Sequence, residues 1–331
     1  MDVGQLRAFT YERQRLGRAA PNGAAALREI IGVYSAHPSA PLSLHARAAK
    51  FDGKAFRRLD ALRLPAMRQS IHLLPAKTAH LAFRAAPAPA SDRAKRFRHF
   101  KLTDKRYEKL RAEILAAAED PKTQEELRDA VGVKDAKELK GVSAQMTRDG
   151  ELVRVAAGQS LRSNELRYTS AEIADADADE ALAWLAGEYL RAFGPIRPKD
   201  FTWWAGTTAT RAKAALATHK TEELDDGYLI LAKDRAAFEK AKPPKGAVDL
   251  LPKWDCLQMG YAPDGRDRFA HRDVIDRCYD FRGDGVPVIL VDGEAAGIWP
   301  GGEIELFDTA TRKVQAAIEK RLAEVEAFLG S

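Results

Sequence analysis

The sequence predicts an α+β fold that is mainly helical, with three tandem winged-helix motifs and a C-terminal β-hairpin and helix that close the fold. Two observations predict this class. Helical segments are followed by short strand-like segments in the same order three times, and turn-forming residues separate the segments. The repeat is one of element order and not of residue identity. The 331 residues suffice for two or three domains, and a hydrophobic content of 45% suffices for a sizeable core.

Residues 1–86 form the first predicted winged helix. Apolar residues recur at helical spacing over 24–34, a second helical stretch covers 42–51, and a third short helix begins at 56–59. Residues 62–74 then have the pattern of a turn and a strand. Helix, helix, helix and hairpin is the element order of a winged helix.

Residues 87–118 are predicted as a basic linker and helix. The stretch 85–91 is rich in alanine and proline, which is typical of a linker, and the most basic stretch of the chain, residues 93–101, follows it. Phe97 and Phe100 lie within this basic stretch. Cations interleaved with aromatic rings suit phosphate contact combined with base stacking.

Residues 119–172 form the second predicted winged helix. Thr123 is the expected N-cap of one helix, because acidic residues fill the first turn after it, and Asp135 is the expected cap of the next. Two strands, near 151–155 and 166–168, are expected to form the wing.

Residues 178–245 form the third predicted winged helix, with a helix over 181–193, two more over 199–206 and 208–217, and a strand over 227–231.

Residues 246–331 are predicted as a C-terminal β/α region. A β-hairpin is expected over 286–299, because an Asp-Gly dipeptide stands between two apolar runs. A strand over 303–307 and an amphipathic helix over 312–329 follow it.

The charge of the chain is unevenly distributed. The formal net charge is only +5, but the first 118 residues carry 23 Lys and Arg against 9 Asp and Glu, and the remaining residues carry 30 against 39. This split predicts a polyanion-binding N-terminal third, with the negative remainder facing away from the polyanion. Repeated helix-turn-helix patterns favour nucleic acid as that polyanion.

Several functional classes are excluded by missing motifs. No run of about 18 apolar residues and no signal-peptide pattern occurs, so we expect no membrane segment. The histidines lack metal-ligand spacing such as HExxH, and GxGxxG, Walker A and GxSxG motifs are absent. We therefore expect no metal, no cofactor and no nucleotide. Cys256 and Cys278 are expected to be reduced, buried thiols in a cytoplasmic, nucleoid-associated protein.

Two N-terminal stretches carry a family resemblance. Residues 34–47, which begin Tyr-Ser-Ala-His-Pro-Ser, resemble the catalytic loop and following helix of the AlkZ/YcaQ-type winged-helix DNA glycosylases. Residues 67–76 resemble that family's wing strand, with an arginine, a serine and a histidine in order. Residues 193–206 are similar to its third winged helix, and residues 250–255 and 288–299 to its C-terminal pattern. The resemblance covers nearly the whole chain.

This resemblance implies tandem winged helices that form a concave basic surface around duplex DNA. It implies monofunctional removal of alkylated purines, mainly N7-alkylguanine and including bulky adducts and crosslinks, without a cofactor. The implied partner is double-stranded DNA with alkylated purines. Three nonidentical winged helices in one chain indicate a monomer that wraps one site, whereas a transcription regulator is normally a dimer that reads a palindrome.

The family's catalytic loop carries glutamine, an apolar residue, and then glutamine or aspartate, where this chain has Ser35, Ala36 and His37. N7 alkylation makes the base a good leaving group, so the enzyme must mainly stabilise an oxocarbenium-like sugar and hold a water for attack. Neutral His37 would accept the proton of that water, and Ser35 would position it. Protonated His37 would repel the sugar cation, so we expect activity to fall below about pH 6.

The remaining expected site residues contact DNA. They lie on the first wing, on the basic stretch, on the second recognition helix and its wing, and on a C-terminal loop: Arg68, Ser70, His72, Arg93, Lys95, Arg96, Arg98, Gln145, Arg148, Arg162, Arg266, Arg268 and His271.

Two alternatives stay open from the residues alone. The chain is a glycosylase if His37 acts on water. If His37 merely caps the helix that begins near Ser39, the chain is a non-enzymatic DNA-binding protein, either a transcription regulator or a lesion-sequestering resistance protein.

Overall fold

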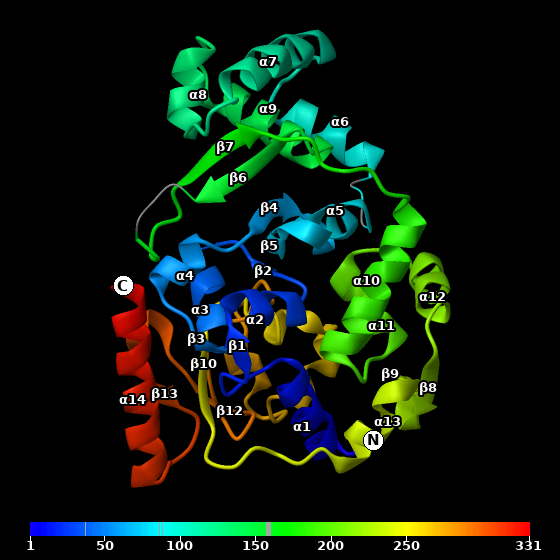
Figure 1. The fold of residues 1–331 in the computed structure, drawn as a ribbon, viewed down its shortest axis with the longest axis vertical. Helices are drawn as coiled ribbons and strands as arrows, with labels where there is room; N and C mark the ends of the chain where they lie inside the picture. The colour runs from blue at the N-terminus through cyan, green and yellow to red at the C-terminus, as the bar shows by residue number, and fades with distance from the viewer. Residues whose placement is uncertain (37, 86, 88, 157–159) are drawn as a thin grey trace.

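The computed structural model describes residues 1–36, 38–85, 87, 89–156 and 160–331. The chain is a mixed α/β protein with several small sheets, in which helices provide most of the regular structure. Figure 1 shows an outer lobe, which we define as residues 89–156 and 160–170, standing at one end of a larger body.

The first part of the body departs from the prediction at two expected helix ends. Residues 33–34 form a strand because they pair with residues 72–73, and residues 48–50 form a strand because they pair in parallel with residues 20–22. Asn22 and Asp52 cap the helices that follow them. The elements are α1 (Val3–Arg13), β1 (Ala20–Asn22), α2 (Gly23–Glu29), β2 (Val33–Tyr34), α3 (Ser39–His45), β3 (Ala48–Lys50), α4 (Gly53–Arg57), β4 (Ala61–Pro65), the 3₁₀ turn η1 (Met67–Gln69), β5 (Ile71–Pro75) and α5 (Ala76–Ala85).

The outer lobe contains the helices and strands expected there. Thr123 and Glu126 form the predicted capping box, and Gly150 ends a helix with a φ of 82°. The basic stretch is itself helical. The elements are α6 (Ala90–His99), α7 (Asp104–Ala117), α8 (Gln124–Ala130), α9 (Ala136–Asp149), β6 (Leu152–Ala156) and β7 (Leu166–Ser170).

The rest of the chain completes the body. The Asp292-Gly293 hairpin is confirmed, since both residues have the positive φ that such a turn requires. The elements are α10 (Ala178–Phe193), α11 (Pro198–Ala205), α12 (Ala209–Ala217), β8 (Thr221–Leu224), β9 (Tyr228–Leu231), α13 (Arg235–Lys240), β10 (Val248–Leu251), β11 (Val288–Val291), β12 (Glu294–Ile298), β13 (Glu305–Leu306) and α14 (Arg312–Leu329), with 3₁₀ turns η2 (Asp225–Gly227), η3 (Ala232–Asp234), η4 (Gln258–Gly260), η5 (Pro263–Arg268), η6 (Ile275–Cys278) and η7 (Pro300–Gly302).

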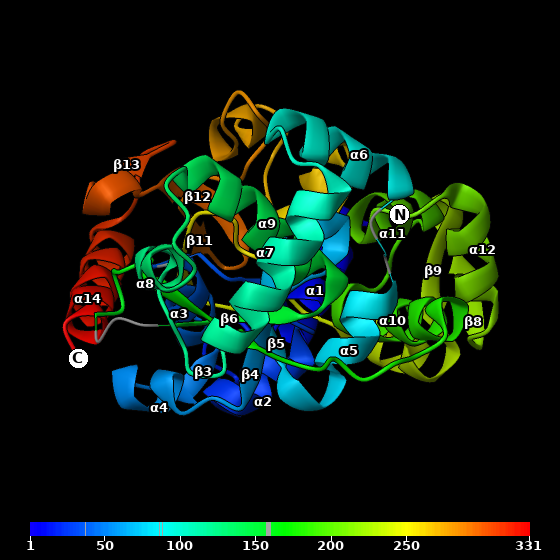
Figure 2. The same ribbon diagram turned by 90° about the horizontal axis from the view of Figure 1, so that it is seen from above.

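A five-stranded sheet joins the outer lobe to the body. Its order is β2-β5-β4-β6-β7, and Arg63 of β4 pairs with Arg154 of β6 across the junction. The strands of the first and second predicted motifs therefore belong to one sheet, so the position of the outer lobe is coupled to that of β4 and β5. Figure 2 shows the outer lobe lying over the body from the orthogonal direction.

The hydrophobic core crosses the predicted boundaries. One cluster runs from Tyr11 to Leu329 and includes side chains from segments 1–86, 178–245 and 246–331. A second cluster occupies the outer lobe, and a third packs α1 against β8, β9 and α13. Cys256 and Cys278 are free, buried thiols, as expected.

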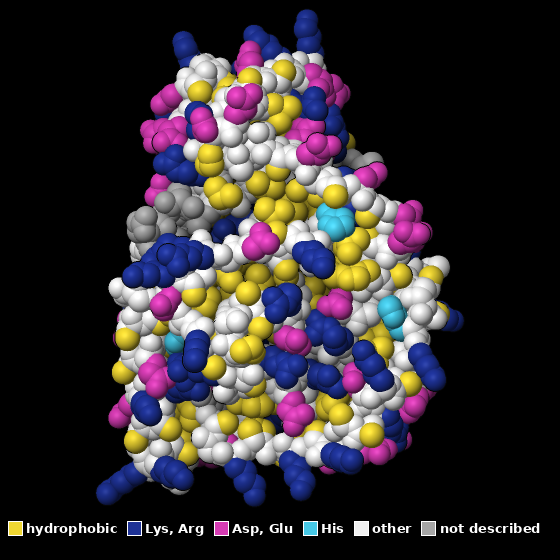
Figure 3. Space-filling view, viewed as in Figure 1, with side chains coloured by type: hydrophobic (Ala, Val, Ile, Leu, Met, Phe, Trp, Pro, Cys, Tyr) yellow, Lys and Arg dark blue, Asp and Glu magenta, His cyan; other side chains and the backbone are white. Residues whose placement is uncertain are grey.

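Ion pairs change the interpretation of the charge split. Cations of the first 118 residues pair with acids further along the chain: Arg7 with Glu294, Arg13 with Asp234, Arg18 with Glu324, Arg47 with Asp255, Arg84 with Asp175, Arg106 with Glu138, and Arg111 with Glu151. The face in Figure 3 accordingly intermixes basic and acidic side chains. Part of the basic third is therefore neutralised by acids of the remainder, and the orientation of that remainder away from the polyanion stays a prediction.

One of these pairs is completely buried. Arg47, just after α3, donates from Nη2 to Oδ1 of Asp255 at 2.7 Å and from Nη1 to Oδ2 at 2.8 Å, and both side chains are 0% exposed. Ser43 Oγ donates to the same carboxylate at 2.8 Å, and Gln14 Oε1 accepts from Arg47 at 3.2 Å. Burial opposes the charge of Arg47, but Asp255 outweighs it and raises the pKa of the guanidinium.

We predict that Asp255→Asn lowers the free energy of unfolding by about 3–5 kcal/mol, because it leaves the Arg47 charge buried without a counter-ion. Chemical denaturation of the purified protein measures this change.

The matched control removes an ion pair at the surface. Arg162 and Glu326 are each about half exposed, so Arg162→Gln is expected to change the same free energy by less than about 1 kcal/mol. Similar small losses for both variants would contradict an organising role for the Arg47–Asp255 pair.

Candidate active site

A pocket of about 500 Å³, which we call the central pocket, opens where five segments of the body meet. These are the end of β2 and the loop after it, the turn between β4 and β5, helix α11, the segment around η4, and the loop before β11. The lining side chains are Tyr34, Ser35, Ala36, Arg68, Ser70, Ile71, Trp203, Trp254, Met259, Arg282, Gly283 and Asp284. Three expected site residues, Ser35, Arg68 and Ser70, thus lie together.

Sheet pairing anchors the loop that leads from β2 to α3. Tyr34 pairs with His72, and the backbone N–H of Ser35 donates to the carbonyl of Ile71 at 3.0 Å. Ser35 is mostly buried at the pocket wall. His37 lies outside the described residues, between Ala36 and Pro38, so its side chain is not placed here.

Two arginines flank Trp203. The guanidinium of Arg68 lies 3.7 Å from the Trp203 ring centroid, and that of Arg266 lies 5.4 Å from it and 3.8 Å from the ring centroid of Tyr279. Arg68 Nη2 also donates to Tyr34 Oη. Arg68 Nη1 and Arg266 Nε are buried and have no hydrogen-bond partner among the described residues. Unpaired N–H groups on two adjacent cations form an environment that attracts an anion such as phosphate.

The turn that carries Arg68 has an unusual backbone. Arg68 and Gln69 both have positive φ, at 52° and 58°. A Cβ atom at Gly206 would come within 3.0 Å of the Arg68 Cα, so only glycine permits α11 to end against this turn. The close approach fixes Arg68 over Trp203.

His72 supports this turn and does not line the central pocket. It is 2% exposed, its Nδ1 lies 2.9 Å from the Ser70 carbonyl, and its ring packs on Tyr34 at 4.5 Å. Burial lowers the pKa of His72 to about 4. The imidazole is therefore neutral at pH 7 and donates to Ser70, and burial removes it from the DNA contacts that the sequence predicted.

A second pocket of about 250 Å³, the basic cleft, lies on the other side of the same turn. It collects the expected contacts Arg93, Arg96, Gln145 and Arg148, together with Arg84 and Gln69, which the sequence did not single out. Gln145 accepts from Arg96 Nε at 3.0 Å and donates to Asp149 at 2.8 Å.

The cations of the basic cleft are crowded. Burial is the main cause that lowers the pKa of Arg148, and the charges of Arg96 and Arg154 lower it further. Burial also lowers the pKa of Arg96. Because a bound anion would relieve this repulsion, the cleft suits phosphate.

The other expected contacts do not line these pockets. Lys95 and Arg98 are exposed on α6, Arg162 pairs with Glu326, and His271 is exposed beside Asp273 at 3.1 Å.

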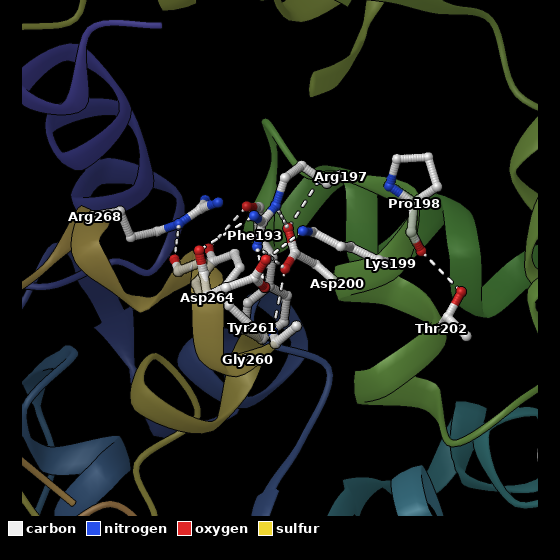
Figure 4. A network of polar contacts seen from close by, with 12 residues as sticks. Phe193, Arg197, Pro198, Lys199, Asp200, Thr202, Gly260, Tyr261, Asp264 and Arg268 are labelled. Carbon is white, nitrogen blue, oxygen red and sulfur yellow. Dashed lines mark hydrogen bonds and ion pairs between the residues drawn. The ribbon is translucent and has the colours of Figure 1, made fainter. Parts of the chain in front are cut away.

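Arg268 is structural. It is 1% exposed, its Nη1 donates to the Pro195 carbonyl at 3.0 Å, and its guanidinium lies 3.6 Å from the Tyr261 ring centroid. Figure 4 shows it in the network around Arg197 and Asp200 that fastens α11 to the C-terminal segment. Its expected DNA contact is not possible in this conformation, since its side chain does not reach the surface.

Sequence reasoning missed three residues at this site. Trp203 and Trp204 are neighbours on a helix, where adjacent residues point about 100° apart. Trp204 is therefore buried, whereas Trp203 lines the central pocket. Asp284 is a carboxylate in the same wall. Phe281 is 91% exposed in the loop that carries Asp284, and an Asp-x-x-Gly-Asp turn pattern was the available signal for that loop.

The lining of the central pocket thus combines two arginines, Arg68 and Arg282, with three hydroxyl side chains and one carboxylate. Such a set can hold a phosphate and a sugar and can orient a water. No group of three or more possible metal ligands occurs within the described ranges. None of the helices in those ranges is long and apolar enough to cross a membrane.

Comparisons with known proteins agree on one family. The model of the family "DNA glycosylase AlkZ-like" matches residues 32–328. Among solved structures, the Streptomyces sahachiroi DNA glycosylase AlkZ is similar at a TM-score of 0.74 and 20% sequence identity, over 100% of this chain and 97% of that chain. At this identity the likeness shows a common fold. A search of curated proteins by sequence found no match.

We predict that the free energy of unfolding decreases as the pH is lowered, because of His72. The unfolded histidine has a pKa near 6.5 and the folded one a pKa of about 4, so only the unfolded state gains a proton between these values. The free energy of unfolding is therefore fully present above about pH 6.5 and falls by about 3 kcal/mol toward pH 4. Denaturation at a series of pH values measures this loss.

The matched variants separate this histidine from others. His72→Asn keeps an N–H for the Ser70 carbonyl and is expected to flatten the pH dependence, whereas His271→Asn replaces an exposed side chain and is the control. Burial also lowers the pKa of His45 to about 4, so part of the slope is expected to remain. An unchanged slope in His72→Asn would contradict the assignment.

Proposed function

The chain belongs to the AlkZ-like DNA glycosylase family, and on that premise we propose that it hydrolyses the N-glycosidic bond of N7-alkylated purines in duplex DNA. Family membership and the shared fold support a DNA repair glycosylase. The substrate, which includes bulky adducts and crosslinks, and the residue roles below are the proposal.

One observation assigns the proposed reaction to the central pocket. Ser35, Arg68 and Ser70, which come from two separate stretches of family resemblance, line a single pocket. Arg266 lies beside Trp203 of that lining, and Arg68 and Arg266 each have one N–H without a partner among the described residues. A nucleotide presents a phosphate, a sugar and a base within a few ångströms. The unpaired N–H groups of Arg68 and Arg266 suit the phosphate, and the hydroxyl-bearing wall suits the sugar.

The reaction needs little acid catalysis, because the alkylated purine is already a good leaving group. The alkylated purine leaves with the electron pair of the C1′–N9 bond and becomes neutral, while positive charge develops on the sugar. A water held by Ser35 attacks C1′, and neutral His37 takes its proton. No cofactor enters this reaction.

The basic cleft supports a path for the DNA backbone. Gln69 lines the cleft and Arg68 lines the central pocket, so one turn separates the two. A strand whose damaged nucleotide occupies the central pocket would place a neighbouring phosphate in the cleft. We propose that a monomer binds in this way, with Lys95 and Arg98 as outer phosphate contacts.

The alternative function is DNA binding without base release. It is favoured by the Ser35-Ala36-His37 loop, which replaces the family's glutamine-containing loop. A protein of this kind would bind and sequester a lesion, or regulate transcription, without releasing a base.

We predict that the protein releases the base from duplex DNA containing N7-methylguanine or a bulkier N7 adduct. Abasic sites are detected by alkaline strand cleavage. His37→Ala is expected to lower release by about 100-fold or more, because a general base contributes about 10²–10⁴-fold.

The outcomes distinguish function from residue role. Tight binding without base release from any of the adducts would establish the sequestering alternative. Full release in His37→Ala would remove only the role of His37.

We predict that Arg148→Gln weakens binding to all duplexes alike and lowers the salt dependence by about one unit in the slope of log K against log salt, because one phosphate contact is lost. Base release at saturating DNA is expected to stay unchanged. Fluorescence anisotropy at several salt concentrations measures the slope.

Arg128→Gln is the matched control, since Arg128 lies on α8 in the same lobe and pairs with Asp129 and Glu125 outside the cleft. Equal slopes of log K against log salt for the wild type and Arg148→Gln would show that the DNA backbone does not contact Arg148 in the basic cleft.

A further inference from the structure

The loop before β11 holds an acid that the proposed mechanism has not used. Asp284 lines the central pocket with Tyr34, Ser35 and Arg68, and it is the one Asp or Glu among the described residues of that lining. Its side chain is half-buried. No described residue donates a hydrogen bond or an ion pair to its carboxylate, although two arginines line the same region.

The loop is rigidly held by other groups. The Asp280 carboxylate accepts from the backbone N–H of Arg282 at 2.9 Å and from that of Asp284 at 3.1 Å, and the N–H of Asp280 donates to the Asp284 carbonyl at 2.9 Å. Lys253 pairs with Asp280. Asp280 therefore has the structural role, while the Asp284 side chain remains available at the end of a preorganised turn.

Electrostatic influence links Asp284 to the pocket wall. Burial is the main cause that raises the pKa of Tyr34, and the charge of Asp284 adds to that increase. Burial lowers the pKa of Arg266, and Asp284 partly opposes that effect. Asp284 and Ser35 also line the same pocket.

We propose that Asp284 is a catalytic residue that supplies the negative charge facing C1′ of the damaged nucleotide, and this rests on the proposed glycosylase function. A loop that reads Ser-Ala-His contains no carboxylate, whereas a carboxylate near C1′ stabilises the developing sugar cation. Asp284 provides this charge from a distant part of the sequence.

Hydrolysis of the glycosidic bond conserves atoms and charge. The C1′–N9 bond breaks and its electron pair leaves on the purine, which becomes neutral. The oxygen of water forms the new bond to C1′, and its proton passes to His37. The Asp284 carboxylate accepts a hydrogen bond from that water.

The test uses two variants of Asp284, one that removes the negative charge and one that keeps it. Asp284→Asn is expected to lower single-turnover release of N7-methylguanine by about 100-fold or more, while DNA binding is unchanged or tighter because a charge that repels phosphate is gone. Asp284→Glu keeps the charge and is expected to retain activity within about tenfold of the wild type. A merely structural role would make both variants lose stability and activity together.

The controls separate this inference from the function on which it rests. Asp276→Asn removes the same charge from an exposed position outside the pocket and is expected to leave release unchanged, with thermal unfolding of every variant checking the fold. Wild-type release that persists in Asp284→Asn would overturn the role of Asp284 alone. Absence of release by the wild type from both N7-methylguanine and a bulkier adduct would overturn the proposed function, and the role of Asp284 with it.

Discussion

The buried pair of Arg47 and Asp255 is the interaction on which both the fold and the site depend. Arg47 follows α3, the helix that begins two residues after His37, and Asp255 follows Trp254, which lines the central pocket. The pair thus holds two walls of the pocket together across more than 200 residues of sequence. Because each charge is costly to bury alone, separation of the two segments is strongly opposed.

A second constraint is the turn between β4 and β5. Its two positive φ values and the close approach of Gly206 fix Arg68 over Trp203 and turn Gln69 toward the basic cleft. The same strands continue into the sheet that carries the outer lobe. One rigid element therefore links the central pocket to the cations of the basic cleft.

The positive charge of the N-terminal third has two roles. Part of it neutralises acids of the remainder, as Arg7 does with Glu294 and Arg18 with Glu324. Another part, including Arg93 and Arg96, gathers in the basic cleft. Net charge counted along a sequence cannot separate these roles, because ion pairing depends on which segments meet in space. Arg268 illustrates the point, since only burial against Tyr261 shows that it is structural.

Local order was determined by the sequence itself. Capping residues such as Thr123, the Asp-Gly turn before β12 and the apolar period of α14 specify elements through interactions within a few residues. The family and the stretch that contains Ser35 were also recognisable from residue order. Tertiary structure alone decided which side chains share the pocket, because Trp203 and Asp284 come from segments distant from Ser35 in sequence. It also decided that Arg268 is buried and that the strands of the first two predicted motifs form one sheet, since long-range packing and pairing leave no local signature.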